Sequence, residues 1–386
     1  MRKRLFTPGP LTTTDSVRSA LNVDWGSRDS AFSELTKRVR DRLTQLVNGA
    51  DSHSTVLLQG AGTFAVEATL ATLVGPSDTL LVLVNGEYGR RITTIAQRLG
   101  KSVQTLEFDE LAPVPEADVA GYLKAHPEIS HVALVQLETT TGVLNPYFDI
   151  AKTVANAGRA LVLDAMSGFG CYPVDVQTLP CTAVIASSNK GLHGVPGIGF
   201  AIIDKAALSQ SQGNCASLSL DLHDQWKGFE NNGQWRFTPP TQCLAALDQA
   251  IEEFLADGGE TGRRNRYDIN AAMVLQRLQG LGFAPLIAPE HRSSVILTFG
   301  FPKGDWFNFP RLYDQLAKEN LFLYPGKLTD QPSFRIGCIG ALDRDDFEAM
   351  LTAFEHAVQD MTSMTDTLES DLILAAQTHS DLGRVQ

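Results

Sequence analysis

Residues 160–200 read ALVLDAMSGFGCYPVDVQTLPCTAVIASSNKGLHGVPGIGF. The stretch contains two short apolar runs, 160–163 and 183–186, and each is followed within a few residues by a charge, Asp164 or Lys190. Runs of this length that are apolar throughout are typical of strands buried on both faces of a parallel sheet. In an open α/β sheet, polar residues at strand ends gather at one edge. The stretch therefore predicts two such strands with Asp164 and Lys190 at neighbouring ends.

The same alternation of apolar and amphipathic segments extends outward over the first two thirds of the chain. Further apolar runs are TVLLQ (55–59), LLVLVN (80–85), HVALVQLE (131–138) and GIGFAIID (197–204). This order predicts an α/β fold with a doubly wound, mostly parallel sheet, followed by a smaller α+β C-terminal domain. We expect an N-terminal segment 1–20, a large domain 21–258, a small domain 259–360, and a frayed C-terminal tail 361–386 with a short helix.

The composition narrows the class of protein. The chain has 386 residues, of which 43% are apolar, and a formal net charge of −12 without a long run of Lys or Arg. Binders of nucleic acid or of anionic membranes usually carry a basic surface, so neither partner is expected. The five cysteines include no Cys-x-x-Cys pair, and no stretch is long and apolar enough to cross a bilayer. We therefore expect a soluble cytoplasmic protein without a disulfide framework or a zinc site.

Asp164 and Lys190 together indicate a specific chemistry. A lysine among small residues and glycines can be desolvated enough to lower its pKa and form a Schiff base with a carbonyl compound. An aspartate at a neighbouring strand end can pair with a pyridinium nitrogen and keep that ring protonated. Taken alone, each residue is more often a helix cap or a solvated surface charge. Their occurrence on successive strands predicts a pyridoxal phosphate site.

The segment GAGTFA, residues 60–65, is the candidate phosphate site. It precedes a stretch with helical spacing, so its amides lie at a helix N-terminus, with the hydroxyl of Thr63 as an extra donor. The same Gly-x-Gly-x-x-Ala pattern also occurs in dinucleotide-binding folds, where an acidic residue usually follows the second strand. Asn85 stands at that strand end, but Glu87 two residues later keeps an NAD-dependent dehydrogenase open as an alternative.

Six further residues have both a functional and a structural interpretation. Tyr88 could stack on a cofactor ring or be an ordinary loop tyrosine, and the threonines 139–141 could bind a ring oxygen or cap backbone groups. Arg335 could grip a carboxylate or phosphonate, or form an internal salt bridge. His223 lies beside two aspartates in LDLHDQW, but nothing at ligand spacing completes a metal site. Structural hydrogen bonding is therefore favoured at His223, and no metal is expected.

Beyond these residues, many segments resemble those of one enzyme family. They include TPGPLTTT (7–14), DWGSRDSAF (24–32), LLQGAGTFAVEA (57–68), NGEYGRR (85–91), ETTTGVLNP (138–146), NKGLHGVPGIGF (189–200), LDLHDQW (220–226), GQWRFTPPT (233–241), LYPGKLT (323–329) and FRIGCIGA (334–341). In this order they resemble the 2-aminoethylphosphonate:pyruvate aminotransferases, which are class V members of the fold-type I pyridoxal phosphate enzymes. The resemblance runs from about residue 5 to 350 and implies the seven-stranded type of sheet.

The resemblance implies a role for each residue around the cofactor ring. Lys190 corresponds to the Schiff-base lysine and proton shuttle, and Asp164 to the partner of the pyridine nitrogen. Tyr88 falls where the family stacks an aromatic ring on the cofactor, and Thr139 where it hydrogen-bonds the ring hydroxyl. Arg335 matches the arginine that binds the anionic end of the substrate.

The resemblance also implies how the phosphate is held and how the chain assembles. Gly62 and Thr63 would bind the phosphate, joined by Thr238 of a second subunit. This arrangement implies a homodimer with active sites at the interface. Pro8 and Gly9 of the N-terminal segment should line the substrate pocket.

The implied reaction moves the amino group of 2-aminoethylphosphonate to pyruvate, giving phosphonoacetaldehyde and L-alanine, in phosphonate degradation. The nearest alternative is a class V aminotransferase that uses alanine or serine with glyoxylate. A non-enzymatic member of the fold is disfavoured because Asp164, Lys190 and Arg335 are all present.

Four positions depart from the family pattern. Ala61 and Gly168 stand where serines are usual, Asn189 where glycine is common, and Arg28 where an aromatic residue is expected. Alanine at position 61 lacks the hydroxyl of the usual serine, which removes one hydrogen-bond donor but no backbone amide and costs at most about 1.5 to 3 kcal/mol. We therefore expect these departures to affect substrate selectivity rather than the cofactor chemistry.

Overall fold

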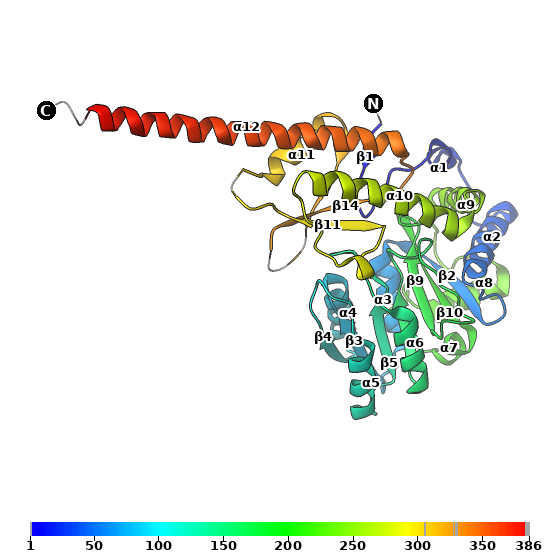
Figure 1. Cartoon of the computed structure of the whole chain (residues 1–386). Helices are drawn as coiled ribbons and strands as arrows, with labels where there is room; N and C mark the ends of the chain where they lie inside the picture. The colour runs from blue at the N-terminus through cyan, green and yellow to red at the C-terminus, as the bar shows by residue number, and fades with distance from the viewer. Residues whose placement is uncertain (1, 305, 327, 329–330, 383–386) are drawn as a thin grey trace.

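The centre of the molecule is a seven-stranded sheet (Figure 1), seen in a computed structural model that describes residues 2–304, 306–326, 328 and 331–382. Along the sheet the order is β2-β10-β9-β8-β5-β3-β4. The strands are β2 (His53–Gly60), β3 (Thr79–Val84), β4 (Ser102–Glu107), β5 (His131–Val135), β8 (Ala160–Asp164), β9 (Ala183–Ser187) and β10 (Gly197–Asp204). β10 is antiparallel to β2 and β9, and the other neighbouring pairs are parallel. The predicted mostly parallel α/β sheet is confirmed.

Helices cover this sheet because its strands are apolar on both faces. Residues in the middle of β3, β5 and β8, such as Val82, Val132 and Val162, are almost fully buried. α2 packs against β2, α3 against β9 and β10, α4 against β3 and β4, and α6 against β8. The helices of this part are α1 (Asp15–Ser19), η1 (Ala20–Asn22), α2 (Ser30–Leu46), α3 (Gly62–Leu73), α4 (Glu87–Arg98), α5 (Glu116–Ala125), α6 (Tyr147–Asn156), α7 (Lys205–Gln210), α8 (Leu222–Asn232) and α9 (Thr241–Ala256).

A second group of elements follows α9 and includes a small antiparallel sheet of order β11-β14-β13. The N-terminal strand β1 (Arg4–Leu5) joins this part by pairing with β12, and Phe6 lies in its apolar core. The elements are α10 (Gly259–Gly280), η2 (Pro289–His291), β11 (Ile296–Gly300), α11 (Phe309–Lys318), β12 (Leu321–Phe322), β13 (Tyr324–Pro325), β14 (Ser333–Gly337) and α12 (Arg344–Leu382). The smaller α+β part is therefore present, whereas the exact domain boundaries stay predictions.

The last helix differs from the expected tail with a short helix. α12 runs without a break from Arg344 to Leu382 and extends beyond the rest of the chain in Figure 1. Neither glycine nor proline occurs between these two residues, so nothing in the sequence interrupts the helix. The expectation that the helix ends near residue 360 came from the polar stretch that follows, and it is wrong because α12 continues to Leu382.

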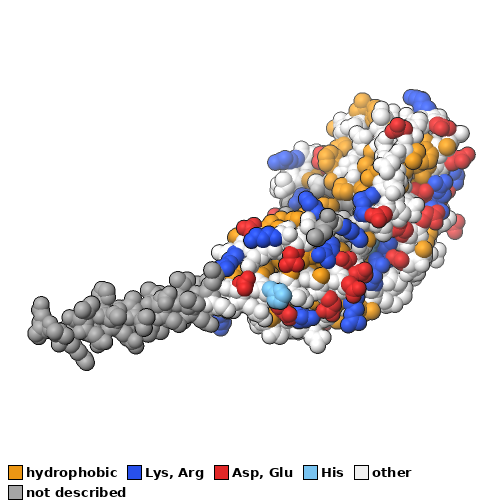
Figure 2. Space-filling view, turned by 90° about the horizontal axis from the view of Figure 1, so that it is seen from above, with side chains coloured by type: hydrophobic (Ala, Val, Ile, Leu, Met, Phe, Trp, Pro, Cys, Tyr) orange, Lys and Arg blue, Asp and Glu red, His pale blue; other side chains and the backbone are white. Residues whose placement is uncertain are grey.

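The outer face of the molecule carries charges of both signs. In Figure 2, acidic and basic side chains are interspersed over the visible face, and neither sign forms a continuous region there. None of the helices in the described part of the chain combines the length and apolarity that a membrane crossing requires.

Candidate active site

Asp164 and Lys190 lie at the ends of two neighbouring parallel strands. Asp164 is the last residue of β8, and Lys190 follows β9, which pairs with β8 in parallel register. Asp164 is 4% exposed, and Met166 N donates to its Oδ1 at 3.0 Å. Burial raises the pKa of Asp164 to about 6, although the nearby Arg91 and Lys190 act in the opposite direction. The predicted placement of the two residues at one sheet edge is therefore observed.

The N-terminal segment closes over Lys190. Lys190 is half-buried, and its Nζ donates to the carbonyl oxygen of Pro8 at 2.7 Å. Gly9 has φ +125°, and a Cβ atom there would lie 2.7 Å from the lysine Nζ and Cδ. Glycine is favoured here because an L-residue with a side chain is strained at this φ. The structure thus brings Pro8 and Gly9 against the lysine, so the interpretation of Lys190 as a solvated surface charge is wrong.

The GAGTFA segment joins β2 to α3 through a tight turn that gives the helix no side-chain cap. Gly60 has φ +130°, and Ala61 is the N-cap of α3 without a side-chain hydrogen bond to the helix. The first amides of an α-helix have no partner within the helix, so this end can receive an anion. A Cβ on Gly62 would lie 2.2 Å from Met166 Sδ, just beyond Asp164. The phosphate candidate is therefore next to the buried carboxylate.

A small cavity of about 30 Å³ lies between α3, α4 and the end of β8, lined in part by Thr63, Tyr88, Arg91 and Asp164. The Arg91 guanidinium carbon is 4.6 Å from the Tyr88 ring centroid, and Nη1 donates to Thr63 Oγ1 at 3.4 Å. The sequence reasoning missed Arg91. The spacing of Tyr88 and Arg91 by three residues on one helix would have placed both on the same face.

Arg335 in β14 is a buried cation with carbonyl partners. It is 3% exposed, and its Nε and Nη2 donate to the Pro325 carbonyl at 3.2 and 3.1 Å, while Nη1 donates to the Thr139 carbonyl at 2.9 Å. Burial lowers the pKa of Arg335. Among the described residues no carboxylate forms an ion pair with it, so the internal salt bridge considered from the sequence is not formed there. A buried guanidinium of this kind favours an incoming anion.

Thr139 and its neighbours form a hydrogen-bonded turn between β6 (Leu137–Glu138) and β7 (Val143–Leu144). The hydroxyls of Thr139 and Ser167 are 2.6 Å apart. The fully buried Glu138 accepts from Thr140 N and Oγ1 at 2.9 and 2.6 Å, and from Tyr88 N at 3.2 Å. Burial raises the pKa of Glu138. Glu138, which the sequence reasoning missed, therefore ties the Thr139 turn to the start of α4.

Two departures from the family pattern have a physical setting. A Cβ on Gly168 would lie 2.1 Å from Oε1 of the buried Gln136, so a serine there would require Gln136 to move. Arg28 donates to Gln234 Oε1 at 3.2 Å, within the loop 233–240. Nothing in the structure explains Asn189.

Thr238 is the predicted site residue that the structure leaves apart from the others. It is exposed in the loop between α8 and α9, whereas Asp164 and Thr139 are buried. Within one chain, its position does not test the role that the resemblance implies.

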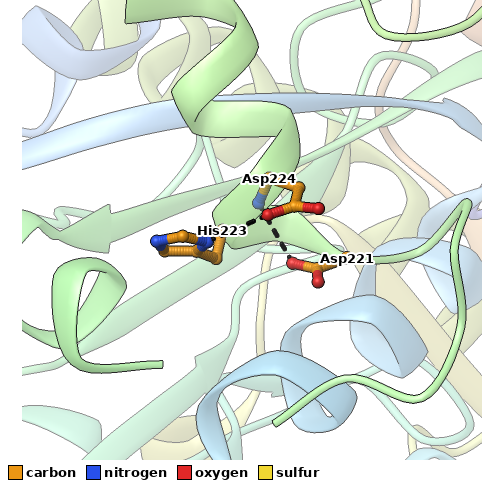
Figure 3. Close-up of side chains that lie close together, drawn as sticks. All are labelled: Asp221, His223 and Asp224. Atoms are coloured by element: carbon orange, nitrogen blue, oxygen red, sulfur yellow. Dashed lines mark hydrogen bonds and ion pairs between the residues drawn. The ribbon is translucent and has the colours of Figure 1, made fainter. Parts of the chain in front are cut away.

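The Asp221, His223 and Asp224 side chains lie together at the start of α8 (Figure 3). Asp221 Oδ1 caps this helix by accepting from Asp224 N at 3.1 Å, and His223 Nδ1 is 3.2 Å from Asp224 Oδ1. The structural hydrogen bonding predicted for His223 is observed.

Comparison with known proteins identifies the family. Residues 17–339 match the profile of the family described as aminotransferase class V. The chain belongs to this family. The matched range includes the glycine-rich segment 60–65, on which the dehydrogenase alternative was based. That alternative is therefore excluded.

Relatives of this class V aminotransferase cover most of its length. It is 45% identical over 357 residues, 92% of this chain and 97% of the other, to the 2-aminoethylphosphonate–pyruvate transaminase of Pseudomonas fluorescens. It is 47% identical over 336 residues, 87% and 89% of the two chains, to 2-aminoethylphosphonate–pyruvate transaminase 2 of Burkholderia lata.

Solved structures share the fold of this class V aminotransferase. The alanine–glyoxylate aminotransferase of Nostoc superposes with a TM-score of 0.86 at 24% identity, covering 93% of this chain and 96% of the other. The pyridoxamine–pyruvate aminotransferase of Mesorhizobium loti gives a TM-score of 0.84 at 23% identity, with 93% and 92% covered. At this identity the likeness concerns the fold alone.

Proposed function

We propose that this class V aminotransferase moves the amino group of 2-aminoethylphosphonate to pyruvate, giving phosphonoacetaldehyde and L-alanine. The observation that carries the proposal is the 45% identity, over 92% of the chain, to a transaminase named for these two substrates. The buried Arg335, whose described partners are carbonyl oxygens, supports it because both substrates carry an anionic group that a guanidinium can bind.

The residues present fit pyridoxal phosphate as the cofactor. The uncapped amides at the start of α3, with Gly62 and Thr63, suit a phosphate group. Asp164 is a buried carboxylate at the adjoining cavity and suits a protonated ring nitrogen. Lys190 on the neighbouring strand end is the amine within the same region. In this proposal Tyr88 stacks on the ring and Thr139 hydrogen-bonds the ring hydroxyl.

Each residue then has a defined task. Bound pyridoxal phosphate supplies an aldehyde for the amine and a ring that takes up the electron pair of the carbon losing its proton. Asp164 holds a proton on the ring nitrogen, and the Lys190 Nζ carries the proton that leaves the substrate carbon. Burial of Asp164 keeps water away from this carboxylate, which strengthens its interaction with a protonated ring nitrogen.

Arg335 would bind the anionic end of each substrate in turn. It grips the phosphonate of the amino donor, and then the carboxylate of pyruvate as the amino group is passed on. Pro8 and Gly9, which lie against Lys190, would line the same pocket and limit the size of the substrate.

We further propose a homodimer in which Thr238 reaches the phosphate of the second subunit's cofactor. Its exposure in the loop 233–240 leaves the side chain accessible to another chain. A cytoplasmic location stays a prediction from the composition.

A comparison of amino donors and acceptors tests the substrate assignment. Purified protein with pyridoxal phosphate and pyruvate should form L-alanine with 2-aminoethylphosphonate, and Lys190→Ala should abolish this turnover. If alanine or serine with glyoxylate were converted efficiently while 2-aminoethylphosphonate was not, the proposed substrates would be wrong.

A further inference from the structure

His193 occupies a buried position where the backbone alone would favour glycine. It lies three residues after Lys190, has φ +63° and is 2% exposed. L-residues with side chains seldom adopt this left-handed conformation unless the surrounding contacts hold them there. We therefore expect hydrogen bonds of the His193 backbone and ring to hold this conformation.

The His193 backbone closes the turn that carries Lys190. His193 N donates to the Lys190 carbonyl at 2.8 Å, and Gly194 N donates to the Ser188 carbonyl at 2.8 Å. A Cβ on Gly191 would lie 2.2 Å from the Phe169 carbonyl oxygen, so this turn is packed directly on its neighbour. Movement of His193 would therefore move the lysine backbone.

The His193 ring connects this turn to two elements of the C-terminal part. Gly340 N donates to Nε2 at 3.1 Å, and since an amide can only donate, Nε2 is the acceptor. The hydroxyl of Tyr267 in α10 also contacts Nε2. Burial raises the pKa of Tyr267 to about 12, so this hydroxyl keeps its proton and donates.

The charges near the ring keep it an acceptor. Burial and the cations Arg263 and Arg266 hold the pKa of His193 well below its usual range. Arg263 is itself almost fully buried, with Nε 2.7 Å from Asp257 Oδ2. The imidazole is therefore neutral and keeps its Nε2 lone pair for the two donors.

We propose that His193 is a positioning residue that fixes the Lys190 turn to Gly340, five residues beyond Arg335, and so sets the separation of these two residues. Gly340 lies three residues after the end of β14, the strand that carries Arg335. The next residue, Ala341, is also held in place, because its N donates to the Thr12 carbonyl at 2.8 Å. The inference rests on the proposed function, in which Lys190 and Arg335 act on opposite ends of one substrate.

Three variants test the link. His193→Phe fills the space without an acceptor, His193→Gln supplies an amide oxygen as a substitute acceptor, and Tyr267→Phe removes one of the two donors. Val274→Ala is the matched control, because it opens the core beneath α10 at a fully buried residue that makes none of these contacts.

The first measurement is hydrogen–deuterium exchange of peptides that contain Gly340, which needs no cofactor. His193→Phe should speed this exchange about tenfold relative to wild type, whereas His193→Gln should stay within about threefold. Val274→Ala should lower the urea midpoint without this local effect. Unchanged exchange in His193→Phe, or equal exchange in the Phe and Gln variants, would overturn the proposal.

The second measurement is the rate at which visible absorbance returns when pyridoxal phosphate is added to cofactor-free protein, together with kcat and KM for 2-aminoethylphosphonate. His193→Phe should slow the return of absorbance about tenfold and raise KM, and Tyr267→Phe should change both quantities by a smaller factor. His193→Gln should bring the rate and KM back toward the wild-type values. A wild-type rate in both His193→Phe and Tyr267→Phe would refute the positioning role. If wild-type protein gained no absorbance, the proposed function would fail instead, and the exchange measurement would still decide the link.

Discussion

At the scale of single residues, the site concentrates charges that are costly to bury. Asp164 and Glu138 are both fully enclosed, and burial raises the pKa of each. Arg335 is a buried cation whose pKa burial lowers. Such groups destabilise the folded chain until a ligand compensates them, which is typical of residues retained for function.

The stability of the cofactor-free protein should depend on the ionisation of Asp164. Its pKa is about 6 when folded against an ordinary 3.8, so the unfolded chain loses this proton first as pH rises from about 4 to about 6. The free energy of unfolding falls over that window and stays reduced above it. Asp164→Asn, which cannot ionise, should be more stable than wild type by up to about 3 kcal/mol near pH 8. Urea unfolding measures the difference.

The same advantage should vanish below about pH 3, where the carboxyl is protonated in the folded and the unfolded chain alike. If Asp164→Asn and wild type differed in free energy of unfolding by the same amount at both pH values, ionisation of Asp164 would not destabilise the folded chain. Despite its stability, Asp164→Asn should be slow, since losing a charge-assisted hydrogen bond of about 1.5–3 kcal/mol corresponds to roughly 10–150-fold in kcat/KM.

Replacing Arg335 by lysine should separate charge from geometry. Lysine keeps the cation but lacks the forked donors, so KM for 2-aminoethylphosphonate should rise about 10- to 100-fold while kcat changes little. Steady-state kinetics give both constants. Arg277→Lys is the matched control and should leave both constants unchanged, because Arg277 of α10 forms its half-buried ion pairs with Glu348 and Glu355 of α12. An unaltered KM in Arg335→Lys would remove Arg335 from the substrate site.

At the scale of elements, the strand ends explain how much of the site the sequence could predict. Apolar runs are local signals, so the placement of Asp164 and Lys190 at one sheet edge followed from the pattern. The role of Glu138 depends on contacts between a turn and a separate helix, which no local pattern contains. Arg91 differs, because its spacing of three residues from Tyr88 on one helix is a local signal. The length of α12 was missed for the opposite reason, because a polar composition was taken as an end where no helix breaker occurs.

The start of α3 lacks a side-chain cap and can be given one. Ala61 has φ −85° and ψ 174°, a conformation that a capping serine adopts. Ala61→Ser should raise the free energy of unfolding of the cofactor-free protein by about 0.5–2 kcal/mol, measured by urea titration. Ala61→Val cannot cap and should give no gain. Equal stability of the Ser variant and wild type would mean that the hydroxyl does not reach the helix amides.

At the scale of the whole molecule, each complete site is expected to need two chains. The N-terminal segment is held to the C-terminal part by the pairing of β1 with β12, and it places Pro8 beside Lys190 of its own chain. Thr238 lies exposed, and its contribution to a site is proposed to come from the partner. Whether Thr238 acts in the site of its own chain or in that of the partner determines which pairs of mutant chains can complement each other.

Heterodimers of Lys190→Ala and Thr238→Glu chains should regain activity. If Thr238 acts across the interface, one site receives an intact lysine and an intact threonine, and the purified heterodimer should show about half of wild-type turnover. The matched control pairs a wild-type chain with a chain carrying both substitutions, and it should be inactive. The reverse pattern would place Thr238 in the site of its own subunit.

In the proposed reaction, 2-aminoethylphosphonate donates its amino group through a cofactor bound at Lys190. The most direct test adds this amine, without any acceptor, to purified protein loaded with pyridoxal phosphate, and records the visible absorbance. The visible absorption band of the loaded protein should disappear with the amine and return when pyruvate is added, and L-alanine should form. The Lys190→Ala protein should show no such cycle. If 2-aminoethylphosphonate left the spectrum unchanged while alanine or serine altered it, 2-aminoethylphosphonate would not be the amino donor.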